Sequence, residues 1–117
     1  MAITRVSGSH AQATFGSSAA ARTLAFGGTL TAGSFLVAVI TQYNASSTTL
    51  TVSDNVNGAW TQAGTYSTMA GFSSVSLWYV RNTSSGIPVL SSLPSVAAYQ
   101  SISLDEYLGV AVISPLR

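Results

Sequence analysis

His10 is the residue of this chain best suited to act as a general base near neutral pH, because the sequence holds one histidine and no lysine or cysteine. A Ser–His–Asp triad would need Asp54 or Asp105 together with one of the many serines. No Gly-x-Ser-x-Gly motif presents a serine as an exposed nucleophile. We therefore interpret His10 as a surface-loop histidine and predict no catalytic residues and no enzymatic activity.

The acidic residues also give little support for hydrolysis. Asp105 and Glu106 are adjacent, so on a strand they point to opposite faces and cannot form the facing carboxylate pair of a glycosidase. Glu106 shares the apolar face of the segment 99–108. This position predicts an inward carboxylate that pairs with an arginine, either Arg81 or Arg22.

The segment 54–58, Asp-Asn-Val-Asn-Gly, has oxygen-bearing side chains like those of a calcium loop. It lacks the later bidentate glutamate, so its affinity for hard cations should be poor. Asn57-Gly58 is more simply a two-residue hairpin turn between two strands. His10 has no second histidine or cysteine nearby for a transition metal. We expect neither a metal nor a cofactor.

Aromatic side chains are the remaining candidates for binding, because exposed rings can stack on the CH faces of sugars while polar neighbours hold the hydroxyls. Trp78 and Tyr79 lie in an apolar segment and are expected in the core. Trp60 and Tyr66 flank a predicted hairpin and are expected at the surface. The candidate ligand-binding residues are Trp60, Tyr66 and Tyr107.

The elements that must position these residues are strands, since apolar residues recur with period two and turn residues recur at intervals of roughly ten residues. The predicted strands are 3–7, 23–26, 35–43, 48–52, 60–67, 73–81, 88–90, 99–106 and 110–113. Residues 7–21 fit an arm, a loop or an irregular strand. The pattern predicts a single domain over 1–117, an antiparallel β-sandwich of about eight strands, jelly-roll or Ig-like, with 1–22 a partly irregular N-terminal arm.

Composition limits the partners. Four arginines far apart in sequence and a net charge of +1 provide no basic stripe for a nucleic acid. Only 6% of the residues are charged and the net charge is low, so electrostatic repulsion between copies is weak. We therefore expect a homo-oligomer or a larger assembly. The apolar run 35–40 is far shorter than the ~20 residues of a membrane helix, and residues 1–15 encode no secretory signal.

Four short motifs occur in the order of a known module. They are the segments 30–39 (LTAGSFLVAV), 52–58 (VSDNVNG), 77–82 (LWYVRN) and 104–110 (LDEYLGV). In this series the chain resembles a module that recurs in large bacterial surface and secreted proteins and in phage structural proteins. The resemblance implies a β-sandwich with a structural or adhesive role and no catalytic residues. Members of the module usually continue past the segment that matches 114–117, so we expect a neighbouring copy or a partner to supply further strands.

Three functional hypotheses follow. The first is a non-enzymatic structural or adhesive module of an external repetitive assembly. Such an assembly would be a phage virion surface, for example a capsid decoration or a tail, or a bacterial surface protein, and the location extracellular or on a virion. The alternative is a lectin-like carbohydrate-binding module, and the third is a small hydrolase built around His10.

Overall fold

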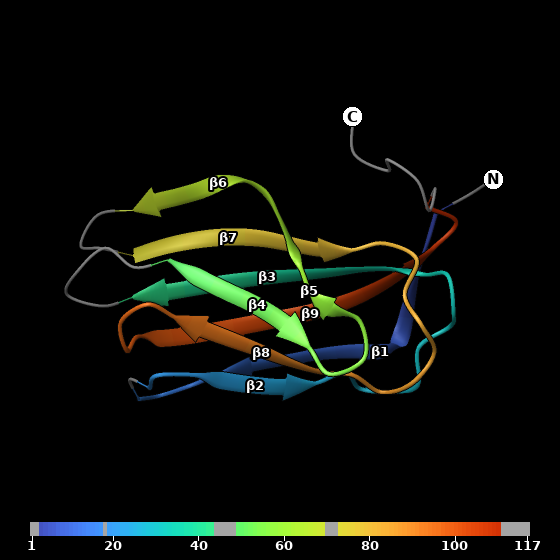
Figure 1. The fold of residues 1–117 in the computed structure, drawn as a ribbon, viewed down its shortest axis with the longest axis horizontal. Helices are drawn as coiled ribbons and strands as arrows, with labels where there is room; N and C mark the ends of the chain where they lie inside the picture. The colour runs from blue at the N-terminus through green and yellow to red at the C-terminus, as the bar shows by residue number, and fades with distance from the viewer. Residues whose placement is uncertain (1–2, 18, 44–48, 70–72, 111–117) are drawn as a thin grey trace.

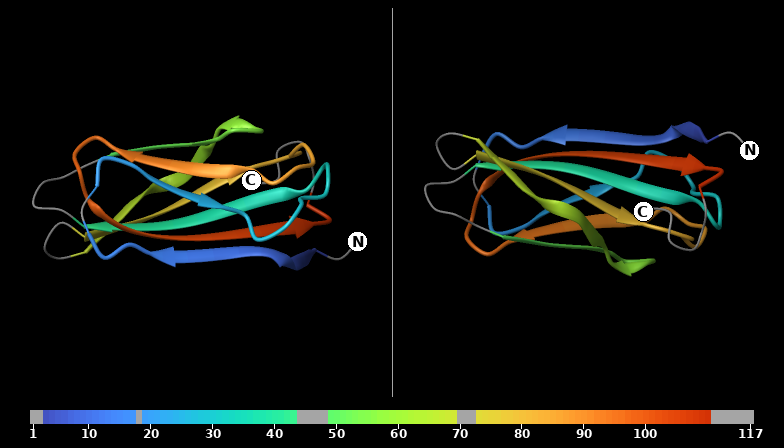
Figure 2. Two further views of the ribbon diagram at one scale, coloured as in Figure 1. Left: turned by 90° about the horizontal axis from the view of Figure 1, so that it is seen from below. Right: turned by 90° about the horizontal axis from the view of Figure 1, so that it is seen from above.

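The computed structural model describes residues 3–17, 19–43, 49–69 and 73–110. In these residues the chain is all-β, and nine strands form two antiparallel sheets (Figure 1). Figure 2 shows β1 and β9 on one side of the molecule and β8 on the other, so the two sheets form separate layers. The antiparallel β-sandwich predicted from the alternating sequence is confirmed.

The five-stranded sheet has the order β1-β9-β3-β7-β6, and the four-stranded sheet has the order β2-β8-β4-β5. In chain order the strands are β1 (Thr4–Thr14), β2 (Arg22–Ala25), β3 (Phe35–Tyr43), β4 (Leu50–Asp54), β5 (Gly58–Ala59), β6 (Thr61–Met69), β7 (Ser73–Val80), β8 (Val89–Pro94) and β9 (Tyr99–Leu108). The chain crosses repeatedly between the two layers, as it does in a jelly roll with two Greek keys. This order decides between the two topologies that the sequence left open.

The strongest sequence patterns predicted strands well, and weaker ones did not. The strand 35–43 has its predicted bounds, whereas 88–90 extends to Pro94 and the following turn begins later than expected. Within residues 7–21, the part up to Thr14 belongs to β1, so of the three alternatives this part is a strand. Residues 111–113 of the strand predicted at 110–113 lie outside the described residues.

The core lies between the sheets, where alternate residues of each strand point inward. Leu36, Ala38 and Ile40 of β3 are fully buried, as are Ile102 and Leu104 of β9. The opposite sheet contributes further buried side chains, Leu50, Val52 and Leu90, and they belong to the same cluster. Burial of a leucine, isoleucine or valine side chain stabilises a fold by about 1.5–3 kcal/mol relative to leaving that side chain exposed.

The edge strand β1 is irregular where it meets the loop after β2. Its pairing with β9 shifts register between Val6 and Ala11. There Ser9 turns inward and is buried, and its carbonyl oxygen accepts a bond from the backbone N–H of Gly27 at 3.0 Å. A Cβ atom at Gly27 would lie 2.4 Å from the carbonyl oxygen of His10, so glycine permits this close approach.

Glu106 is fully buried at the inner face of β9 and is held by neutral donors. The Ser9 hydroxyl donates to Oε1 at 2.7 Å, and the backbone N–H of Thr31 donates to Oε2 at 2.8 Å. The predicted pairing with Arg81 or Arg22 is wrong. Arg81 is exposed, and Arg22 donates to Ser17 and lies over the Phe15 ring. The carboxylate instead links β1, β9 and the loop that leads into β3.

Loss of the Glu106 carboxylate should destabilise the protein strongly. We expect Glu106→Ala to lower the free energy of unfolding by about 3 kcal/mol, because it leaves two buried donors without an acceptor. Glu106→Gln should cost less, since the amide keeps one oxygen acceptor and the Ser9 hydroxyl can reorient. Urea unfolding followed by circular dichroism measures both values. Equal stability of the alanine variant and the native protein would contradict this role.

Candidate functional site

Two of the three predicted ligand-binding residues can be placed, and they do not form a platform. Trp60 is only 5% exposed, so the prediction of an exposed ring is wrong. Its ring stacks on Phe26 at 6.3 Å between centroids, inside the core. Tyr107 is half-buried and, by strand alternation from the buried Glu106, lies on the outer face of β9. The side chain of Tyr66 lies outside the described part of the structure.

Asp54 explains why Trp60 turns inward. Its Oδ2 accepts the indole N–H of Trp60 at 2.7 Å and the side-chain N–H of Asn57 at 3.2 Å. Its Oδ1 accepts the backbone N–H groups of Val56, at 2.7 Å, and Asn57. The β4–β5 hairpin that the sequence favoured over a calcium loop is present, but its loop is 55–57, and Gly58 pairs with Asp54 at a φ of 80°. Both carboxylate oxygens are therefore used by N–H donors.

Calcium should not stabilise this loop. We expect the same Tm in calcium chloride and in EDTA, because cation binding would have to displace the N–H groups that Asp54 accepts. Asp54→Ala should lower the free energy of unfolding by about 2–4 kcal/mol, since the buried donors lose a charged acceptor. Thermal unfolding of both proteins, with and without calcium, tests this. A rise in Tm with calcium that Asp54→Ala abolishes would restore the cation-site interpretation.

His10 lies on strand β1, at the surface rather than in the predicted surface loop, and contacts an acidic residue. Its Nδ1 is 2.9 Å from Asp105 Oδ1, the oxygen that also accepts a bond from Arg5 Nε at 2.7 Å. The side chains of His10 and Arg5 are 38% and 44% exposed. Asp105 faces outward while Glu106 is buried, so the two carboxylates do point to opposite faces. The cluster resembles a surface ion-pair group more than a water-excluded catalytic site.

Metal binding has no structural support in the described residues. Their histidine and acidic side chains nowhere gather in a group of three that could hold a metal ion. The outer-face cluster contributes His10 and Asp105 alone, with Arg5 as the third member. A cation next to Arg5 would be repelled.

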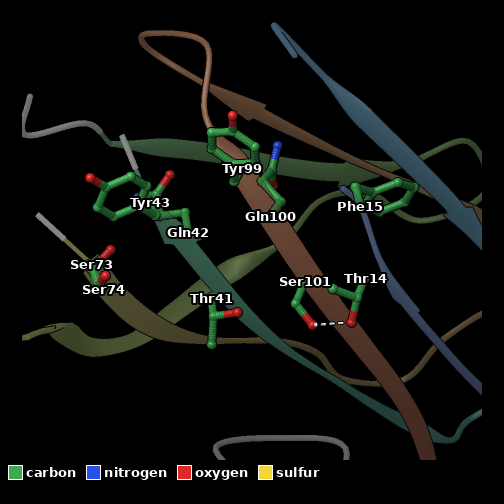
Figure 3. Close-up of a pocket in the computed structure, with 10 residues that line it drawn as sticks. All are labelled: Thr14, Phe15, Thr41, Gln42, Tyr43, Ser73, Ser74, Tyr99, Gln100 and Ser101. Atoms are coloured by element: carbon green, nitrogen blue, oxygen red, sulfur yellow. Dashed lines mark hydrogen bonds between the residues drawn. The ribbon is translucent and has the colours of Figure 1, made fainter. Parts of the chain in front are cut away.

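A shallow hollow of about 390 Å³ opens at one end of the five-stranded sheet. Its most prominent residues are Tyr43, the last residue of β3, and Tyr99, the first residue of β9, which pair directly in register. Their rings lie 6.3 Å apart at an interplanar angle of 46°, and each residue is nearly half exposed. Figure 3 shows the two rings side by side at one end of the hollow.

A row of hydroxyl groups borders the tyrosine pair. Thr41 on β3 and Ser101 on β9 pair with each other, each two residues along its strand from a tyrosine. Thr14 on β1 stands opposite Ser101. Figure 3 shows Ser101 and Thr14 joined by one hydrogen bond, 3.4 Å long. That distance is long for two hydroxyl groups, so the bond is weak. The hollow thus places aromatic faces beside hydroxyl groups that can donate or accept.

From the sequence, Tyr43 and Tyr99 were two of several aromatic candidates, but Trp60, Tyr66 and Tyr107 were selected instead. Tyr43 and Tyr99 lie far apart in the chain, and neither is flanked by a distinctive motif. They meet because β3 and β9 pair antiparallel, which brings the end of one strand to the start of the other. The available signal was that one predicted strand ends at a tyrosine and another begins at one.

The outer face of β3 and β7 carries a second feature, an exposed apolar row. Val39 and Leu77 pair in register and are 40% and 41% exposed. Two residues along, Val37 pairs with Tyr79, whose ring stacks on Phe35 at 5.5 Å. Tyr79 is half-buried on the outer face, so its predicted place in the core is wrong, whereas Trp78 is buried as expected. The outward residues of these two strands include no charged side chain. We call Val37, Val39, Leu77 and Tyr79 the apolar row.

Comparison with models of protein families, with curated protein sequences and with solved structures gives no significant match for this chain. The described part of the structure has no helix of the length and apolar character that crossing a membrane requires. The resemblance to the surface and phage module stays an expectation from the sequence.

Proposed function

We propose that this protein is a non-enzymatic β-sandwich module that acts by surface contact, as a structural or adhesive unit of an external repetitive assembly. Such an assembly would be a phage virion surface, a phage tail or a bacterial surface protein. The observation that carries the proposal is the apolar row. Val39 and Leu77 are each about 40% exposed on two neighbouring strands whose outward residues carry no charge, and such apolar neighbours are typical of an interface.

The partner we propose for the apolar row is a second copy of this chain. Charges on the described outer face lie toward β1 and β9, where Arg5 and His10 both contact Asp105. Two copies could therefore meet through β3 and β7 without bringing like charges together. The net charge of +1 adds little long-range repulsion.

The surroundings of His10 favour contact over catalysis. General base catalysis needs a substrate proton within hydrogen-bond reach and gains from exclusion of water. His10 is exposed on an edge strand. Its Nδ1 contacts Oδ1 of Asp105, the same oxygen to which Arg5 donates. The jelly-roll fold is used by both capsid and lectin domains, so the fold is compatible with either role and does not choose between them.

Self-association through the apolar row is the direct test. We expect sedimentation velocity to show concentration-dependent association of the native protein. The double variant Val39→Thr/Leu77→Thr should weaken it about tenfold or more, because each copy loses apolar contact area. Threonine keeps the strand propensity, so the fold should persist.

Leu93→Thr is the matched control, since Leu93 is 49% exposed on β8 in the opposite sheet. It should leave the association unchanged. A native protein that stays monomeric at all concentrations would count against the proposal. So would equal weakening by the control.

A further inference from the structure

We propose that the hollow at Tyr43 and Tyr99 is a binding site for a neutral oligosaccharide, with sugar rings stacked on the tyrosines and their hydroxyl groups bonded to Thr14, Thr41 and Ser101. This site is distinct from the apolar row and does not depend on it. A binding module of this kind would attach its assembly to a glycan.

The two tyrosine rings form an open, partly exposed pair. Tyr43 and Tyr99 are 48% and 46% exposed although they contact each other, so each ring keeps surface free for a ligand. Their planes are tilted by 46°, which forms an open angle rather than a closed stack. Two such rings offer adjacent apolar faces to the CH groups of one or two sugar units. A volume of about 390 Å³ lies in the range of small-ligand sites, roughly 300–1,000 Å³.

The hydroxyl row lies close enough to the tyrosines to bond a sugar that is stacked on them. Along an extended strand two residues span about 7 Å, so the hydroxyl row lies next to the tyrosines on the same face. A sugar stacked on a ring would direct its equatorial hydroxyls sideways, toward this row. The weak bond between Thr14 and Ser101 costs little to replace, because the ligand supplies a new partner.

The lining of the hollow is uncharged. None of the residues that line the hollow is an arginine, an aspartate, a glutamate or a histidine. A charged ligand would lose its hydration without gaining a counter-charge from the lining. The adjacent guanidinium, that of Arg22, lies over Phe15 and already donates to Ser17. A purely apolar ligand would cover the hydroxyls of Thr14, Thr41 and Ser101 without bonding them. A neutral sugar, with apolar faces and a polar rim, satisfies both parts of the site.

An NMR titration of the ¹⁵N-labelled full chain tests this proposal, with cellohexaose, maltohexaose and chitohexaose as probes. We expect saturable shifts for at least one probe, confined to amides of 41–43, 99–101 and Thr14. Tyr43→Ala and Tyr99→Ala should each weaken binding about tenfold, the effect of losing one aromatic contact. Tyr43→Phe should retain most of the affinity, because the ring face remains.

Leu93→Thr is the control here too, since Leu93 is 49% exposed on β8 in the opposite sheet and neither lines the hollow nor belongs to the apolar row. It should leave sugar binding unchanged. Absence of saturable binding by all three probes would overturn the proposal. So would binding that survives both tyrosine-to-alanine changes, or that Leu93→Thr weakens equally.

Sedimentation of the same variants separates this site from the apolar row. We expect Tyr43→Ala to leave self-association intact. Weaker self-association in Tyr43→Ala, without sugar binding by the native protein, would identify the hollow as a protein contact and overturn the oligosaccharide site.

Discussion

A buried carboxylate that accepts hydrogen bonds from two neutral donors holds this sandwich together at one end. Glu106 sits at the inner face of β9, and its two oxygens accept bonds from Ser9 on β1 and from the backbone of Thr31, just before β3. These are the two strands that flank β9 in the sheet. Because an unpaired buried carboxylate is costly, any arrangement that separates the three segments is strongly disfavoured. The interaction therefore specifies register as well as adding stability.

The register of β9 determines what the outer face presents. A slip of one residue would bring every inward side chain of β9 outward and every outward one inward. In the observed register Glu106 stands opposite Leu36, and the same ladder places Tyr99 opposite Tyr43 and Ser101 opposite Thr41. The aromatic pair and the hydroxyl row are thus consequences of a constraint at the other end of the strand. The apolar row belongs to the same sheet, on the pairing of β3 with β7.

Local alternation was enough to predict the sandwich, the bounds of β3 and the inward position of Glu106. The partner of Glu106 was not predictable, because Ser9 is 97 residues away in a segment of small residues without a clear period. Trp60 was misplaced because it follows a turn, and turns are usually exposed. The capture of its indole N–H by Asp54, six residues earlier, is a side-chain interaction that the residue pattern does not encode. The tyrosine pair depends on long-range strand order, which no single segment specifies.

The pairing of β3 with β9 is most directly tested by a NOESY spectrum of the native protein in solution. The observed register predicts cross-strand NOEs between Tyr43 and Tyr99, whose ring centroids lie 6.3 Å apart, and between Thr41 and Ser101. NOEs that instead place Tyr43 opposite Gln100 or Ser101 would show a shifted register. That result would break the pairing of Tyr43 with Tyr99 and of Thr41 with Ser101, and it would contradict the binding surface derived from these pairs.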